Sequence, residues 1–204
     1  MFTYFRKSGR LMASLSLFAL LAACHSLSEA TDISEIEATP EPVAVVYVIP
    51  KGAHASSNSS FKLVNTQKLR FEVTFDSSAV YTSAKPENQF DINKLYGLSD
   101  CSTHHQVNSA RFGWRWNSNR LELHAYTYQG GSRKSEFLAV AALGKPLVCE
   151  LLLENGKYTF KAGEKQVTLP RGCNGNTDAY QLYPYFGGDE VAPHDIRISI
   201  RELL

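Results

Sequence analysis

Residues 147–170, LVCELLLENGKYTFKAGEKQVTLP, decide the fold class of this 204-residue chain. Asn155-Gly156 is a strong signal for a two-residue β-hairpin turn. Pairing outward from this turn gives one apolar face, made by Leu153 with Tyr158, Leu151 with Phe160, and Cys149 with Ala162. The other face pairs Glu150 with Lys161, which carry opposite charges. With a second turn at Gly163-Glu164, the segment predicts a meander of three antiparallel strands.

The rest of the chain shows the same period of two. Residues 69–75 and 196–200 alternate apolar with polar side chains, as strands with one buried face do. No window of twelve or more residues between 43 and 204 has a helical stripe, and turn residues recur every eight to twelve positions. This spacing predicts an all-β fold, an antiparallel β-sandwich.

Residues 111–128, RFGWRWNSNRLELHAYTY, read as two strands around a loop at 117–120. The predicted apolar face pairs Phe112 with Ala125, Trp114 with Leu123, and Trp116 with Leu121, so the tryptophans are expected in the core. The opposite face pairs Arg111 with Tyr126, Gly113 with His124, and Arg115 with Glu122, and Tyr128 lies beyond.

This polar face has two interpretations. Arginine recognises carboxylates with a planar fork, and tyrosine offers a flat ring with a polar tip, which suits an acidic or neutral saccharide. The candidate ligand-binding residues are Arg111, Arg115, Glu122, His124, Tyr126 and Tyr128. Alternatively, Arg115 and Glu122 are an ordinary surface pair and His124 is a solvated histidine.

The first 42 residues are not expected in the folded domain. Residues 1–23 have a basic start and an apolar run, as secretory signal peptides do. The end of this run, Leu21-Ala22-Ala23-Cys24, resembles a bacterial lipobox, which implies cleavage before Cys24 and its acylation. Residues 24–42 are acidic and poor in large apolar side chains, which predicts a flexible tether. The expected location is the bacterial cell envelope, lipid-anchored on the secreted side; the alternative is an ordinary secreted protein.

Residues 43–204 then form a single β-sandwich domain. The chain has 21 basic and 20 acidic residues. Signal peptide and tether account for three basic and five acidic residues, which leaves 18 basic against 15 acidic ones. This balance is too mild to predict a nucleic-acid partner.

Three cysteines lie within this domain. Cys101 and Cys173 both lie in polar, turn-rich segments, and disulfides persist in exported proteins, so we expect a bridge between them. The alternative is a zinc site from these two cysteines with His104 and His105. Cys149 lies on an apolar strand face and is expected to be an inert buried thiol. The preferred interpretation includes no metal and no cofactor.

Two segments resemble known proteins. ENGKYTFKAGEKQVTLP (154–170), followed by YPYFGGDEVAPHDIRISI (183–200), is similar to the closing strands of concanavalin A-like jelly rolls. Together with LYGLSDCSTHHQ (95–106) and RFGWRW (111–116), the chain resembles an uncharacterised family of short bacterial lipoproteins over about residues 66–201. The jelly-roll resemblance implies two curved antiparallel sheets, with carbohydrate sites on the concave outer face.

An enzymatic activity is not evident from the residues. Jelly-roll glucanases carry E-x-D-x-E or E-x-D-x-x-E on one strand, and residues 43–204 contain neither spacing. Residues 158–163, YTFKAG, resemble a motif of jelly-roll alginate lyases, but the partner Gln-x-His motif is missing. His124 with Tyr126 or Tyr128 would supply the base and acid of a lyase.

The sequence therefore favours a non-catalytic carbohydrate-binding or envelope lipoprotein. A polysaccharide lyase or hydrolase, and a structural protein with an unidentified protein partner, stay as alternatives.

Overall fold

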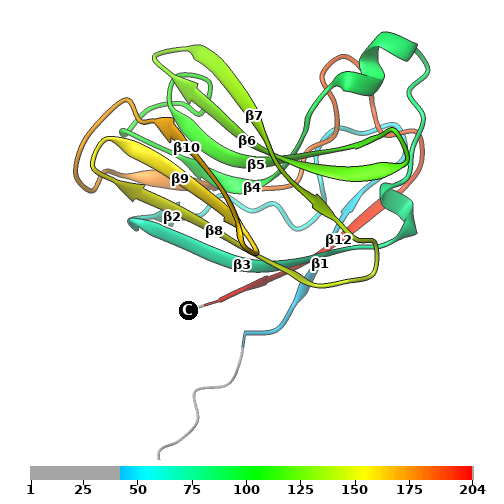
Figure 1. Cartoon of the computed structure of the whole chain (residues 1–204), viewed down its shortest axis with the longest axis horizontal. Coiled ribbons are helices and arrows are strands. Elements are labelled where there is room, and N and C mark those ends of the chain that lie inside the picture. Colours follow the sequence, from blue (N-terminus) through cyan, green and yellow to red (C-terminus); the bar gives the residue numbers. More distant parts are fainter. Residues whose placement is uncertain (1–41, 204) are drawn as a thin grey trace, which may run out of the picture. The chain divides into compact units, whose positions relative to one another are not determined.

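Two antiparallel sheets make up the computed structural model, which describes residues 42–203. The predicted signal peptide, Cys24 and nearly all of the predicted tether lie outside the described residues. The strands are β1 (Val45–Ile49), β2 (Leu63–Val64), β3 (Lys68–Phe75), β4 (Asn93–Ser99), β5 (Ser109–Asn117), β6 (Arg120–Gln129), β7 (Ser132–Ala141), β8 (Leu147–Glu154), β9 (Lys157–Ala162), β10 (Lys165–Pro170), β11 (Ala179–Leu182) and β12 (Ile196–Glu202). Sheet A has the order β1-β12-β3-β8-β9-β10, and sheet B has the order β2-β11-β4-β5-β6-β7 (Figure 1).

Helical structure in the described residues is limited to two 3-10 turns, η1 (Ser77–Ala79) and η2 (Pro86–Phe90). Among residues 42–203, no helix has the length and apolar character needed to cross a membrane. The all-β prediction is confirmed, and its basis is the period-two pattern, which buries alternate side chains along each strand.

The predicted meander is confirmed in its register. Cross-strand partners in β8, β9 and β10 include Leu151 with Phe160 and Phe160 with Val167. On the solvent side, Lys161 Nζ lies 3.0 Å from Glu150 Oε1, as their opposite charges indicate. The Asn155-Gly156 turn has positive φ at both residues, the conformation that this sequence favours.

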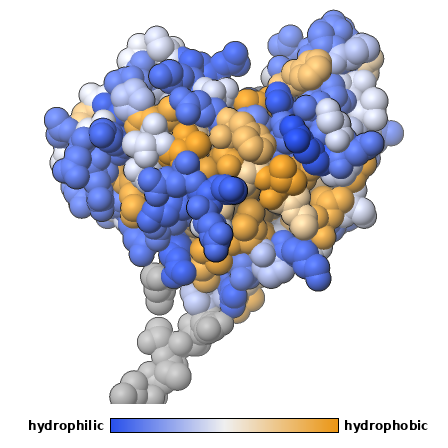
Figure 2. Space-filling model, viewed as in Figure 1, coloured by the Kyte–Doolittle hydropathy of each residue, from blue (hydrophilic) through white to orange (hydrophobic). Residues whose placement is uncertain are grey.

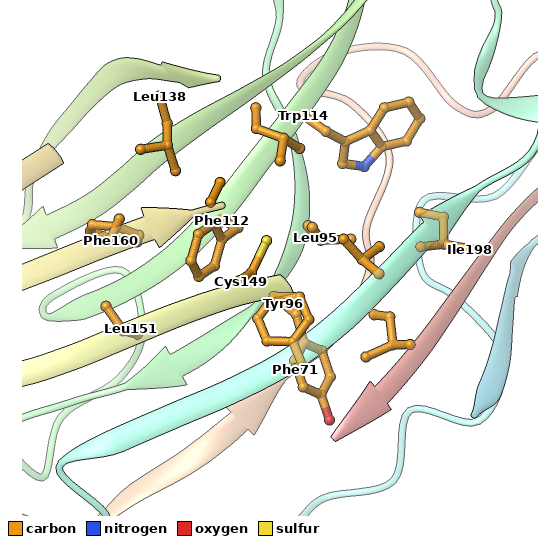
Figure 3. Packing of buried hydrophobic residues seen from close by; sticks show 14 of the residues in the cluster. Phe71, Leu95, Tyr96, Phe112, Trp114, Leu138, Cys149, Leu151, Phe160 and Ile198 are labelled. Carbon is orange, nitrogen blue, oxygen red and sulfur yellow. The ribbon is translucent and has the colours of Figure 1, made fainter. Parts of the chain in front are cut away.

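The core lies between the sheets and is rich in aromatic side chains (Figure 3). Phe112 of sheet B packs edge-to-face against Phe71 at 5.3 Å and against Phe160 at 5.2 Å, both of sheet A. Trp114 is fully buried, and Trp116 packs against the core from a partly buried position. Both tryptophans therefore serve packing, as the sequence predicts.

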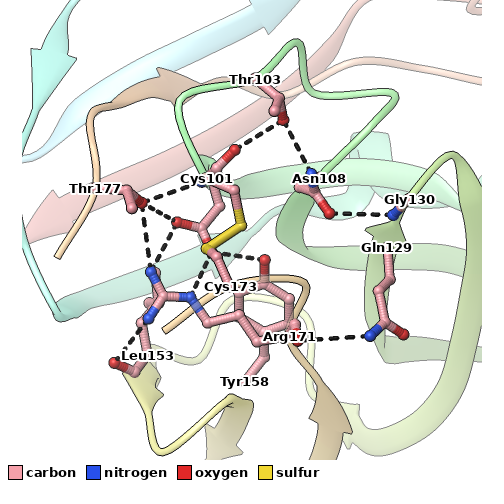
Figure 4. Close-up of polar contacts among 11 residues, drawn as sticks. Cys101, Thr103, Asn108, Gln129, Gly130, Leu153, Tyr158, Arg171, Cys173 and Thr177 are labelled. Atoms are coloured by element: carbon pink, nitrogen blue, oxygen red, sulfur yellow. Dashed lines mark hydrogen bonds and ion pairs between the residues drawn. A yellow bond between two sulfur atoms is a disulfide. The ribbon is translucent and has the colours of Figure 1, made fainter. Parts of the chain in front are cut away.

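A buried ion pair joins the sheets at the end of β4 (Figure 4). Asp100 accepts two hydrogen bonds from Arg171, with Nε at 2.6 Å and a second guanidinium nitrogen at 2.9 Å. It also accepts hydrogen bonds from the Tyr158 hydroxyl at 2.7 Å and the Thr177 hydroxyl at 2.8 Å. We call these four residues the Asp100 brace. Because Tyr158 belongs to β9 and Asp100 follows β4, the brace connects sheet A with sheet B.

A disulfide between Cys101 and Cys173 lies beside the brace. The two sulfurs are bonded to each other, which leaves no thiolate at either position for the zinc alternative. The bridge ties the loop after β4 to the segment after β10. Cys149 is free and buried, and burial raises the pKa of its thiol to about 12, so this thiol is unreactive at neutral pH.

Candidate functional site

The outer face of sheet B carries a polar hollow of about 240 Å³. In Figure 1 this face looks upward, between the β6–β7 hairpin and the η2 segment, and Figure 2 shows the outline of the described domain indented there. We call this feature the Arg111 hollow. Its lining is Lys94, His105, Gln106, Arg111, Tyr126, Tyr128, Tyr185, Gly187 and Gly188.

Strand register brings the hollow's main side chains together. Arg111 of β5 pairs with Tyr126 of β6, as predicted, and Lys94 of β4 pairs with Gly113 of β5. Tyr185 pairs with Lys94 through two backbone hydrogen bonds, of 2.8 and 2.9 Å. Side chains on one face of neighbouring strands lie within contact distance, so these residues converge.

Gly97 provides the space in which Arg111 lies. The pairing of β4 with β5 is irregular between Lys94 and Gly97, which indicates a bulge. A Cβ atom at position 97 would lie 2.2 Å from the Ala110 carbonyl oxygen and 2.9 Å from Arg111 Cγ. Any side chain here would displace Arg111. The shape of the hollow therefore requires glycine at position 97.

Arg111 is a buried cation without an anionic partner in the described part of the chain. Arg111 is only 8% exposed. Its Nε atom has no hydrogen-bond partner within residues 42–203. Its guanidinium carbon lies 5.5 Å from the centre of the Tyr126 ring, a cation–π contact. Burial lowers the pKa of Arg111 from its ordinary value. A buried charge without a counter-ion is costly, which marks this guanidinium as a place where an anion would be stabilised.

Lys94 adds a second cation to the hollow. Its ammonium group donates a 2.8 Å hydrogen bond to the Gly187 carbonyl oxygen and lies 5.2 Å from the centre of the Tyr126 ring. Burial, and then the charge of Arg111, lower the pKa of Lys94 to about 8. At neutral pH most Lys94 side chains are therefore still charged, and the hollow is positive.

Aromatic rings line much of the remaining wall of the hollow. Tyr185 is 38% exposed, and its ring stacks on the His54 ring at 5.2 Å with an interplanar angle of 10°. One ring face of Tyr185 is thus held against His54. Nδ1 of His105 lies 2.9 Å from the Tyr180 hydroxyl, and burial lowers the pKa of His105 to about 4. His105 is accordingly neutral at pH 7.

The second half of the predicted face lies outside the hollow. Glu122 is 1% exposed, receives a hydrogen bond from Arg115 Nε at 2.7 Å, and also pairs with Arg120 at 2.7 Å. Nε2 of His124 lies 3.4 Å from Glu122 Oε2, but without hydrogen-bond alignment. The Glu122 carboxylate is thus paired with Arg115 and Arg120, whereas Nε2 of His124 has no hydrogen-bond partner among the described residues.

Gly113 separates the two halves of the face. A Cβ atom at position 113 would lie 2.4 Å from Ile92 Cγ2, so the Ile92 side chain covers the sheet at this point. The structure therefore brings Arg111, Tyr126 and Tyr128 together and places Arg115, Glu122 and His124 elsewhere.

Six lining residues of the hollow were not among the sequence-based candidates for ligand binding: Lys94, His105, Gln106, Tyr185, Gly187 and Gly188. Each comes from a segment whose neighbours are set by long-range pairing. The aromatic and basic side chains of 94–96 and 183–186 were a signal, but no local pattern placed them beside Arg111.

The comparisons with known proteins identify a fold. No known family and no curated protein matches this sequence. Among solved structures, alginate lyase AlyC3 is 11% identical with a TM-score of 0.52, covering 77% of this chain and 72% of that chain. Its complex with dimannuronate is 12% identical with a TM-score of 0.51, covering 77% and 71%. An alginate lyase from Alteromonas sp. 272 is 8% identical with a TM-score of 0.48, covering 80% and 88%. The described domain is a jelly-roll β-sandwich of the concanavalin A-like kind.

Proposed function

We propose that this protein binds an acidic polysaccharide at the Arg111 hollow and leaves the chain intact. The observation that carries this proposal is Arg111 itself, a buried guanidinium with no anionic partner within residues 42–203. A ligand carboxylate would supply the missing counter-ion through two parallel hydrogen bonds. Lys94 would add a second, charge-assisted contact.

The aromatic walls and the fold point to a sugar rather than a simple anion. The half-exposed Tyr185 ring offers an apolar face to a pyranose ring, and Tyr128 offers a hydroxyl beside it. Jelly-roll neighbours include an alginate lyase in complex with dimannuronate, an acidic disaccharide. The same fold with a cationic hollow on its outer face supports a carboxylated saccharide as the ligand.

Replacing Arg111 by alanine is expected to weaken binding of an acidic oligosaccharide about 100-fold, because a desolvated, charge-assisted pair is lost. Isothermal titration of the full-length protein with an oligomannuronate checks this result. Arg197→Ala is the matched control, because Arg197 lies on sheet A and its side chain is 53% exposed. Equal affinity of Arg111→Ala and the native protein would exclude the hollow as the binding site.

The stability of Arg111→Met distinguishes a binding role from a structural one. Methionine keeps much of the arginine volume and removes an uncompensated buried charge, so we expect an unchanged or higher Tm. A structural arginine would show the reverse, a lower Tm with little effect on affinity. The same thermal scan therefore tests why Arg111 is present.

A lyase activity is the second candidate, and neutral His105 favours it. His105 and Tyr128 line the same hollow as Arg111. In a β-elimination, His105 would take the C5 proton of a uronate, the C4–O bond would break as a C4=C5 double bond forms, and Tyr128 would protonate the leaving oxygen. The titration mixtures are therefore also read for ultraviolet absorbance of unsaturated ends. Absorbance that disappears in His105→Ala would establish the lyase in place of the binding protein.

We also propose that the protein is a lipoprotein, held at a membrane through acylated Cys24. The support is the Leu21-Ala22-Ala23-Cys24 sequence after an apolar run. Cys24→Ser is expected to move the protein from the membrane fraction to the soluble fraction of cells. Mass spectrometry of the N-terminal peptide without lipid on Cys24 would contradict this proposal.

A further inference from the structure

A second hollow lies on the outer face of sheet B, next to the Arg111 hollow. It has a volume of about 460 Å³, and we call it the Tyr180 hollow. Its lining is Leu63, Ser99, Ser102, Thr103, His104, Asp178, Ala179 and Tyr180. None of the residues described so far as ligand contacts belongs to it.

The two hollows adjoin at a hydrogen-bonded pair. The Tyr180 hydroxyl lies 2.9 Å from Nδ1 of His105 and accepts a 3.0 Å hydrogen bond from the His105 backbone N–H. His105 lines the first hollow and Tyr180 the second. Strand β11, with Tyr180, and strand β5, with Arg111, are separated by β4, so they lie about 10 Å apart. Two linked sugar rings span such a distance.

The chemistry of the Tyr180 hollow differs from that of the first. Its described lining contains no lysine or arginine, and it includes the exposed Asp178 carboxylate and the hydroxyls of Ser102 and Thr103. Like charges at short distance repel, so Asp178 disfavours a second carboxylate on the ligand at this place. Hydroxyl groups of an uncharged sugar would instead donate hydrogen bonds to the Asp178 carboxylate.

Exposed apolar side chains flank this hollow. Phe61 is 76% exposed and Leu63 is 70% exposed. The Phe61 ring lies 5.6 Å from the Tyr180 ring at an angle of 34°. Exposed aromatic rings at the edge of a polar hollow are suited to stacking on the apolar face of a sugar.

From this juxtaposition we infer that the ligand is a heteropolysaccharide in which an acidic sugar in the Arg111 hollow is linked to an uncharged sugar in the Tyr180 hollow. This inference rests on the proposed function and narrows its substrate class. A polymer with a carboxylate on every unit satisfies only the first hollow. A chain that alternates uronate with an uncharged sugar satisfies both.

Two tetrasaccharides of equal length test the inference in titrations of the full-length protein. One is tetramannuronate, with a carboxylate on each unit, and the other is a hyaluronan tetrasaccharide, in which glucuronate alternates with N-acetylglucosamine. We expect the hyaluronan fragment to bind about tenfold more tightly. Phe61→Ala is expected to weaken its binding about fivefold, and Asp178→Asn to strengthen tetramannuronate binding. Phe90→Ala is the matched control, because Phe90 is also exposed, at 62%, and lines neither hollow.

The outcomes separate the two proposals. Equal affinity for both tetrasaccharides, with no effect of Phe61→Ala or Asp178→Asn but strong loss in Arg111→Ala, overturns the heteropolysaccharide and keeps the acidic-glycan site. No loss in Arg111→Ala overturns the proposed function and, with it, this inference. A loss in Phe90→Ala as large as in Phe61→Ala overturns the assignment of the second hollow.

Discussion

Replacement of Asp100 by alanine is expected to lower the free energy of unfolding by about 3–5 kcal/mol, because it breaks a buried ion pair. Asp100 is 1% exposed, and only 2% of the Arg171 side chain is exposed. Without the carboxylate, the Arg171 guanidinium would stay buried without a counter-ion. The hydroxyls of Tyr158 and Thr177 would also lose their acceptor.

Urea unfolding of the purified variant measures this effect. Asp100→Asn keeps an acceptor oxygen and should cost less than Asp100→Ala. Arg197→Ala breaks a solvent-exposed pair with Asp195 and should change stability by about 0–1 kcal/mol. A loss in Asp100→Ala no larger than in this control would show that the brace does not stabilise the sandwich.

Low pH should cause part of the loss in the free energy of unfolding that we expect for Asp100→Ala. Burial raises the pKa of Asp100, but hydrogen bonds from Arg171, Tyr158 and Thr177 outweigh it and hold the pKa below its ordinary value. A depressed carboxyl pKa stabilises the fold above the unfolded value of about 3.9, and this contribution disappears as the pH falls through the folded value. The stability difference between native protein and Asp100→Asn should therefore shrink below about pH 4.

Loss of the Cys101–Cys173 disulfide is the second large effect that we expect. The bridge spans 72 residues, and the chain-entropy account assigns about 4 kcal/mol to the closure of a loop of this length. The double variant Cys101→Ser/Cys173→Ser is compared with the native protein in urea. Chemical reduction should give the same shift, because Cys101–Cys173 is the one disulfide within residues 42–203.

Binding by the disulfide variant adds a second readout. The bridge anchors the segment that contains His104 and His105, one wall of each hollow. Affinity for acidic oligosaccharides should therefore fall even where the protein is fully folded. Because the bridge and the Asp100 brace are neighbours, their effects on stability should not add. Unchanged stability and affinity in the double variant would assign the disulfide no structural role.

Local patterns were enough to predict much of the fold. The pairings of β5 with β6 and of β8 with β9 and β10 follow from short loops and alternating side chains, since a slip by one residue would expose the apolar face. The order of strands in each sheet, by contrast, does not follow from local patterns. It joins β11 with β4 and β12 with β3 across long stretches of sequence, and the jelly-roll assignment within the all-β class came from resemblance.

The residues of the candidate site also divide into those that local patterns group together and those that long-range pairing brings in. Arg111, Tyr126 and Tyr128 lie on one face of a local hairpin, so alternation was sufficient to group them. Alternation also grouped His124 with them, because it cannot show that Ile92 covers Gly113 and closes that part of the face. Lys94 and Tyr185 come from distant segments, and their approach depends on the bulge in β4 and on a bridge between loops.

The position of the disulfide has a consequence for proteolysis of this domain. His104 is exposed in the loop between β4 and β5, where an endoprotease has access. A backbone cut there separates Cys101 from Cys173 in sequence, but the two fragments stay covalently joined through these residues. Strands from both fragments also alternate within each sheet, as in β11-β4-β5 and β12-β3-β8. A nicked domain thus remains one particle under oxidising conditions, and on a denaturing gel it separates into two bands only after reduction.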